Sequence, residues 1–161
     1  MTIKTADLCD THLQELQHIA LLLKDYGGVT AFHGEIATVQ CFEDNSFVKK
    51  TLQEAGRNRV LLVDGGGSKR CALLGDLLAQ LAIDNHWRGV VINGCIRDSD
   101  IIATLNIGVK ALATNPRKSE KKDRGTCNIE VNFGGVSCKP GDWLYADSDG
   151  IVVSPQALHT S

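Results

Sequence analysis

Apolar residues recur along the chain with two periods, one typical of helices and one typical of strands. In the first third, apolar positions at helical spacing predict a helix from Thr11 to Tyr26, and Gly27-Gly28 would end it. Residues 36–42 alternate as a strand does. Next, Asp44-Asn45-Ser46 offers caps for a helix that reaches Ala55. The first third is therefore expected to be helix, strand, helix.

The central part reads as buried strands separated by helices. Uninterrupted apolar runs at residues 60–63 and 89–92 predict two buried strands, and a helical pattern lies between them. This order predicts a parallel pair with a right-handed crossover. The helix either begins at Gly75-Asp76 or runs without a break from Lys69 to Asn85. We prefer the first, because a glycine in mid-helix costs about 1 kcal/mol relative to alanine.

The last third changes character. A short helix over residues 101–105 and a strand at 109–113 are followed by a polar, strongly basic stretch at 115–126, which predicts a mobile loop. Four short apolar segments then follow, at residues 129–133, 136–138, 143–146 and 151–153, with turn signals between them. The whole pattern predicts one α/β domain over residues 1–161, with a β-rich carboxyl-terminal layer.

Composition restricts the function. The 161 residues are 43% hydrophobic and 22% charged, and the net charge of -2 gives no reason for direct binding to nucleic acid or to an anionic membrane. No apolar stretch is long enough to span a bilayer, and the amino terminus lacks a signal core. The six cysteines form no Cys-x-x-Cys pair. We expect a cytoplasmic protein with reduced thiols.

Candidate chemistry lies where the central strands end. Arg97-Asp98 follows the strand at 89–92, and Asp76 stands at the predicted helix start. If the central strands are neighbours, these residues share one edge of the sheet, where α/β folds bind ligands. Asp98, with Asp76 directly or through water, could hold a divalent cation that takes a keto acid, and Arg97 could stabilise an enolate. The alternative is a capped turn or a surface ion pair of little energetic weight.

Backbone groups add to this candidate site. At the start of a helix, the N–H groups of Asp76, Leu77 and Leu78 would be free to bind a carboxylate. The glycine-rich stretch 65–70 lacks the spacing of a phosphate-binding loop, so we expect it to let the backbone pass close to a ligand or a neighbouring subunit. The acidic stretch 147–150 is expected to be a hairpin turn and not a calcium loop.

Several motifs resemble one known family over nearly the whole chain. They are Val63-Asp-Gly-Gly-Gly-Ser68, Gly75-Asp-Leu-Leu78, Gly94-Cys-Ile-Arg-Asp98, Asn132-Phe-Gly-Gly-Val136 and Ala146-Asp-Ser-Asp-Gly150. The family is named for the regulator of ribonuclease activity A (RraA), and it also contains the class II 4-hydroxy-4-methyl-2-oxoglutarate aldolases. The resemblance implies a swivelling β/β/α fold with a central mixed sheet, assembled as a ring-shaped homotrimer.

The same resemblance implies roles for individual residues. It places substrate binding on Gly75, Asp76, Leu77, Leu78 and Arg97, catalysis on Arg97 and Asp76, and metal ligation on Asp98. The implied cofactor is Mg2+ or Mn2+, and the implied substrate is a small 2-keto acid. The implied reaction cleaves 4-hydroxy-4-methyl-2-oxoglutarate to pyruvate through a metal-stabilised enolate, with oxaloacetate decarboxylase as a side activity.

A second function remains open. Longer aldolases of the family carry a carboxyl-terminal acidic residue that reaches the neighbouring subunit's metal, and the sequence to Ser161 has no evident counterpart. Weak metal affinity and slow turnover are therefore expected. The short form resembles the regulators that bind and inhibit ribonuclease E. The alternative is thus a protein that modulates RNA degradation through that partner.

Overall fold

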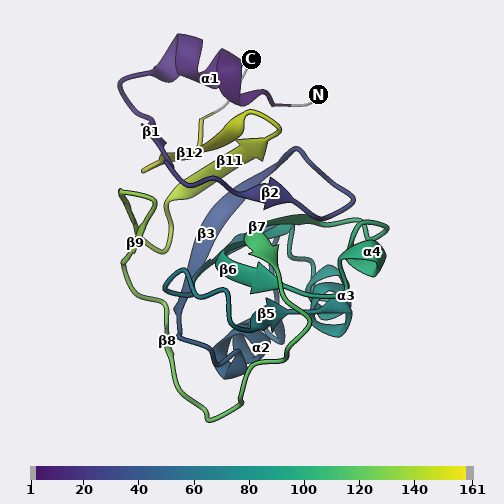
Figure 1. Cartoon of the computed structure of the whole chain (residues 1–161). Coiled ribbons are helices and arrows are strands. Elements are labelled where there is room, and N and C mark those ends of the chain that lie inside the picture. Colours follow the sequence, from purple (N-terminus) through teal and green to yellow (C-terminus); the bar gives the residue numbers. More distant parts are fainter. Residues whose placement is uncertain (1–2, 159–161) are drawn as a thin grey trace.

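One mixed sheet organises the computed structural model, which describes residues 3–158 (Figure 1). The helices are α1 (Thr5–His12), α2 (Ser46–Leu52), α3 (Asp76–Asp84) and α4 (Ser99–Ile102). The first seven strands are β1 (Gln17–His18), β2 (Lys24–Asp25), β3 (Phe32–Gln40), β4 (Val60–Asp64), β5 (Ala72–Leu74), β6 (Gly89–Ile96) and β7 (Gly108–Thr114). The remaining strands are β8 (Thr126–Cys127), β9 (Val131–Phe133), β10 (Val136–Cys138), β11 (Trp143–Asp147) and β12 (Gly150–Ser154).

Strand β3 joins the two parts of this sheet. Its first residues pair antiparallel with β11, with Glu35 opposite Trp143, and its second half pairs parallel with β4, with Ile36 opposite Val60. Strands β4, β6 and β7 continue in parallel, as the buried runs predict. The main order is β1-β12-β11-β3-β4-β6-β7-β2, with β5 beside β6 and β8 beside β3.

The alternation of side chains in β4 shows how the layers form. Leu61 and Val63 belong to a core shared with α2, α3 and α4, whereas Val60 and Leu62 belong to a core shared with β9 to β12. All four side chains are fully buried. A strand covered on both faces must be apolar throughout, which explains the uninterrupted run in the sequence. The architecture is the expected β/β/α arrangement.

The amino-terminal helix prediction is wrong. Residues 11–26 do not form one helix, because α1 ends at His12 and two short strands follow. Gln17 pairs with Val153 of β12, and Lys24 pairs with Ala111 of β7. The apolar residues at helical spacing do not share one buried face: Ile19 is buried, whereas Leu13 is 70% exposed. Pairing with distant strands overrides the local period.

The other elements lie close to their predicted positions, with two additions. Helix α3 begins at Asp76, as preferred over a continuous helix from Lys69, and the four carboxyl-terminal segments are strands. The additions are β5, in a stretch that the sequence assigned to no element, and β8, which begins at the last residue of the predicted loop. The basic stretch 115–126 is largely irregular, and its mobility stays a prediction. Within residues 3–158, no helix is long and apolar enough to cross a bilayer.

Candidate functional site

The register of two short parallel segments creates the candidate site. Strand β5 pairs with the end of β6, with Leu74 opposite Ile96, and the Arg97 N–H donates to the Leu74 carbonyl over 2.9 Å. The residues that follow each strand therefore lie side by side. Gly75-Asp76 from one strand meets Arg97-Asp98 from the other. The sequence placed Asp76 after the strand at 60–63, but it is β5 that carries it.

Asp98 links the two segments directly. Its Oδ2 accepts a hydrogen bond of 3.1 Å from the Asp76 N–H, so it caps α3 from another element. The cap residue in sequence, Gly75, has no side chain to do so. Asp98 itself has φ 57° and ψ 39°, the left-handed conformation, at the start of α4. A non-glycine residue in this region is uncommon, and such residues cluster at functional sites.

Gly75 allows the segments to approach this closely. A Cβ atom at this position would lie 2.8 Å from Asp98 Oδ2 and 3.5 Å from Arg97 Nε. Its φ of -124° suits any residue, so contact distance and not backbone conformation favours glycine here. The Gly75-Asp76 start of α3 is thus part of the site wall.

The helix N–H groups are not as free as the sequence predicts. The Asp76 N–H binds Asp98, and the Leu77 N–H donates to Asp76 Oδ1 over 2.9 Å. Two carboxylates of the chain itself thus occupy two of the three expected donors. The physical reason is the one that suggested an anion site: a helix start favours negative charge. A substrate carboxylate would share or replace these bonds.

All the predicted site residues line one cavity of about 380 Å³. It includes Gly75, Asp76, Leu77, Leu78, Arg97 and Asp98. Leu77 is 81% exposed, which is unusual for leucine, while Arg97 is half-buried and Asp98 is exposed. Their functional roles remain predictions; what the structure adds is that Gly75-Asp76 and Arg97-Asp98, which lie 22 residues apart in the sequence, line one cavity.

Three further cationic residues of this cavity escaped the sequence analysis. They are Lys49 from α2, and Lys118 and Lys121 from the basic stretch. No sequence pattern pointed to them, because a run of charges usually marks a solvated loop. Four cationic side chains of this cavity, Arg97 and the three lysines, can therefore attract negative charge.

Asn45 adds a polar group to the same cavity. Its Nδ2 donates to the Leu73 carbonyl over 3.3 Å, which orients the amide. Its Oδ1 is buried and accepts no hydrogen bond from residues 3–158. A buried acceptor without a donor costs free energy, so a ligand hydroxyl that donates to it would be stabilised.

The donor set suits a hydrated hard cation. Asp76 and Asp98 supply carboxylate oxygens, the ligands that Mg2+ prefers. Within the described part of the chain, no group of three or more His, Cys, Asp or Glu side chains gathers that could enclose an ion. One or two carboxylates with water in the remaining positions is the usual way proteins hold Mg2+. The residues present therefore fit the implied cofactor.

The cysteines offer no rival chemistry at this site. All six are free, and none lines the cavity. Burial, assisted by nearby carboxylates, raises the pKa of Cys41 and of Cys138 to about 12. Thiols with such pKa values carry almost no thiolate at neutral pH, so they are poor nucleophiles.

Known proteins match this chain over almost its full length. A protein of Pseudomonas paraeruginosa, named as a candidate 4-hydroxy-4-methyl-2-oxoglutarate aldolase, is 52% identical over 155 residues, 96% of each chain. A crystal structure from Geobacillus kaustophilus, titled S-adenosylmethionine: 2-dimethylmenaquinone methyltransferase, is 50% identical with a TM-score of 0.96 and covers 97% of each chain. The structure titled RNA-processing inhibitor RraA, from Thermus thermophilis, is 40% identical with a TM-score of 0.95, covering 99% of this chain and 96% of the other.

These relatives carry names for three different activities, so likeness to them defines the family and not the reaction. The sequence profile of the RraA-like family, described as Aldolase/RraA, matches residues 5–153. The fold, the motifs and these matches agree. The chain belongs to the RraA-like family of aldolases and RraA proteins.

Proposed function

We propose that this protein is a divalent-metal-dependent class II aldolase that cleaves 4-hydroxy-4-methyl-2-oxoglutarate into two molecules of pyruvate. One observation carries the proposal: Asp76, Arg97 and Asp98 share one cavity with three lysines. The relatives named as aldolases support the same reaction class. The cofactor would be Mg2+ or Mn2+, held by Asp98 with water and with help from Asp76.

The four cations that line the cavity suit a substrate with two carboxylates. The 2-keto acid end would lie at Arg97, whose planar guanidinium matches a carboxylate or an enolate. The second carboxylate would lie among Lys49, Lys118 and Lys121. A cavity of about 380 Å³ lies within the usual range for small-molecule sites.

The proposed reaction is a retro-aldol cleavage. The C4 hydroxyl loses its proton, the C3–C4 bond breaks, and its electron pair remains on C3 as the enolate of pyruvate. C4 becomes the keto carbon of the second pyruvate, and protonation of C3 completes the first. A bound cation would act as a Lewis acid toward the keto and carboxylate oxygens. Arg97 would stabilise the charge that develops on the enolate oxygen.

The same site would decarboxylate oxaloacetate. Loss of carbon dioxide breaks the bond between C3 and the distal carboxylate carbon and leaves the same pyruvate enolate. Arg97 would stabilise this enolate as it does in the aldol cleavage. The side activity therefore requires no additional residues.

The test is pyruvate formation from each substrate by purified protein with Mg2+ or Mn2+. Arg97→Ala and Asp98→Asn are each expected to lower kcat/KM about 100-fold or more, because each removes a group aimed at developing charge or at the cation. Matched controls are Arg57→Gln and Asp100→Asn, whose side chains do not line this cavity. Full activity in the Arg97 and Asp98 variants would refute this site.

A second arm tests the substrate class. Lys121→Gln should weaken cleavage of 4-hydroxy-4-methyl-2-oxoglutarate about 10-fold, because a charge-assisted contact to a carboxylate is lost. The same substitution should leave 4-hydroxy-2-oxopentanoate, which lacks the second carboxylate, almost unaffected. Equal losses on both substrates would contradict the proposed role of Lys121.

A second candidate function is regulation of ribonuclease E. The 40% identity to the protein titled RNA-processing inhibitor RraA favours it, and a catalytic cavity does not exclude a partner surface. We propose a homotrimer as the active assembly for either function. Sedimentation equilibrium tests the trimer, and inhibition of RNA cleavage by purified ribonuclease E tests the partner. Absence of binding at micromolar concentrations would reject the regulatory function.

A further inference from the structure

A second cavity, of about 370 Å³, lies beside the candidate site and has no role in the proposed reaction. It is formed where the chain after β3, the end of the glycine-rich loop and the basic stretch 115–126 meet. Five cationic side chains and one aromatic ring line it: Arg70, Arg117, Lys118, Lys122, Arg124 and Phe42. Lys118 also lines the cavity of about 380 Å³ that contains Asp76, Arg97 and Asp98, which we call the keto-acid cavity. We call this second volume the basic cavity.

The side chains that line the basic cavity carry a net positive charge, although the whole chain carries a net negative charge. Its five cationic side chains face only three carboxylates, Glu43, Asp44 and Glu120, so the local balance is positive while the chain carries -2. Glu43 is held by a two-pronged contact from Arg70 and by the Ser68 hydroxyl. Glu120 pairs with Lys122 over 2.8 Å. Among the described residues, no carboxylate lies within ion-pair distance of Arg117, Lys118 or Arg124.

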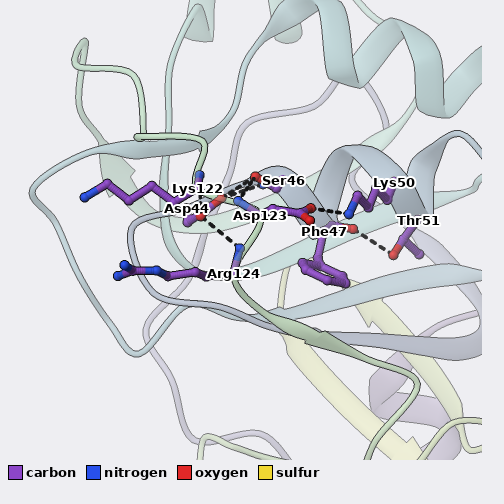
Figure 2. Close-up of polar contacts among 8 residues, drawn as sticks. All are labelled: Asp44, Ser46, Phe47, Lys50, Thr51, Lys122, Asp123 and Arg124. Atoms are coloured by element: carbon purple, nitrogen blue, oxygen red, sulfur yellow. Dashed lines mark hydrogen bonds and ion pairs between the residues drawn. The ribbon is translucent and has the colours of Figure 1, made fainter.

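The buried carboxylate of Asp44 fixes the cationic wall in place. This side chain is only 3% exposed, and its Oδ2 accepts hydrogen bonds from the backbone N–H groups of Lys122 (2.8 Å) and Arg124 (3.2 Å). Its Oδ1 accepts from the Ser46 N–H and hydroxyl. Figure 2 shows the side chains of Lys122 and Arg124 extending in the same direction, away from α2. The backbone that carries these two cations is thus anchored before any ligand binds, which lowers the entropic cost of ordering this segment on binding.

Phe42 gives the basic cavity an apolar surface. Its ring is 58% exposed, and the Arg70 guanidinium carbon lies 5.8 Å from the ring centroid. Gly66, at φ 66°, brings the glycine-rich loop against the ring, because a Cβ there would lie 2.9 Å from Phe42 Cδ1. An exposed aromatic ring beside guanidinium groups suits a flat ring attached to an anion.

We propose that the basic cavity binds a nucleoside phosphate, with the phosphates at Arg117 and Arg124 and the base against Phe42. Guanidinium groups bind phosphate oxygens in pairs, and several cations in one cavity favour a multiply charged phosphate over a singly charged halide or monocarboxylate. The volume of the cavity lies within the range of small-molecule sites. This proposal does not rest on the aldolase reaction, and it is tested by binding alone.

The experiment is isothermal titration calorimetry of the full chain with ADP and with inorganic pyrophosphate. Wild-type protein should bind both. Arg117→Gln and Arg124→Gln should each weaken both ligands about 10-fold, because each removes a charge-assisted hydrogen bond. Phe42→Ala should weaken ADP and leave pyrophosphate unchanged. These substitutions leave the backbone N–H anchors to Asp44 in place, and circular dichroism checks the fold.

Arg57→Gln is the matched control, since it removes one positive charge from a different cavity. It should bind ADP as the wild type does. Failure of wild-type protein to bind ADP at millimolar concentration would overturn the proposal. Wild-type affinity in the Arg117→Gln/Arg124→Gln double variant would also overturn it. An unchanged ADP affinity in Phe42→Ala would reject the base contact and, with it, the assignment to a nucleoside.

Discussion

Gly75 is the residue where the site has no room for a side chain. The atom that an added Cβ would meet, 2.8 Å away, is Asp98 Oδ2, the end of a side chain and not backbone. A larger residue would therefore displace the proposed metal ligand without disturbing the sheet. An added methyl group at position 75 should therefore affect metal binding and leave folding almost unchanged.

We expect Gly75→Ala to raise the Mg2+ concentration required for half-maximal activity about 10-fold, because a displaced Asp98 loses its orientation. The free energy of unfolding should change by less than about 1 kcal/mol, since φ at this position suits alanine. Metal titration of activity and urea denaturation measure the two effects.

Gly135→Ala is the control, and its expected effects are the opposite of those of Gly75→Ala. Its φ is 81°, and no heavy atom lies within 4 Å of an added Cβ. It should lower stability by about 1 kcal/mol through backbone strain and leave the metal requirement unchanged. Opposite results for the two glycines would contradict the account of Gly75.

At the scale of elements, Asp44 joins α2 to the basic stretch. Burial raises the pKa of the Asp44 carboxyl, but hydrogen bonds from the Ser46 side chain and backbone and from Lys122 and Arg124 outweigh it, so the pKa lies below its ordinary value. A depressed folded-state pKa means that the carboxylate stabilises the fold above the unfolded-state pKa of about 3.9. This contribution is lost as the pH falls through the folded-state value.

Asp44→Ala should therefore destabilise the protein by about 2 kcal/mol at pH 7, because several N–H donors lose their acceptor. The difference from wild type should shrink as the pH falls below about 4. Urea denaturation at pH 7 and at low pH measures both values. Hydrogen exchange should show faster exchange at residues 122–124 in the variant. Asp123→Ala removes an exposed carboxylate from the same segment and should change stability by less than about 0.5 kcal/mol.

The elements also show which predictions from sequence succeed. The strand at 60–63 was predictable because a strand covered on both faces must be apolar along its whole length. The start of α3 was predictable because Gly75 interrupts the helical pattern. The prediction of a helix over residues 11–26 failed because Gln17 and Lys24 pair with strands more than 80 residues away. The spacing of neighbouring apolar residues contains no information about such pairing.

At the scale of the whole molecule, Lys118 joins two cavities. The same cation lines the keto-acid cavity and the basic cavity, so a ligand in one changes the electrostatic potential in the other. A phosphate that attracts Lys118 would weaken its hold on the second carboxylate of a keto acid. Binding at the two sites is then coupled, and the coupling must be reciprocal.

We expect saturating ADP to raise KM for 4-hydroxy-4-methyl-2-oxoglutarate about five-fold. The non-cleavable dicarboxylate 2-oxoglutarate should weaken ADP binding by the same factor. Lys118→Gln should abolish both effects, whereas Lys121→Gln should retain them, because Lys121 lines the keto-acid cavity alone. Coupling that survives in Lys118→Gln would show that the two cavities communicate by another route.

The sequence by itself determined the family motifs, the buried faces of the central strands and the positions of Asp76, Arg97 and Asp98 at the ends of elements. These features follow from the composition of each segment and from the spacing of its apolar residues, and neither depends on distant parts of the chain. Only the tertiary structure decided that β5 pairs with β6, that Asp98 caps α3 and that three lysines line the same cavity as Arg97. Those arrangements depend on strand register and on contacts between distant segments, and neither can be inferred from the spacing of neighbouring residues.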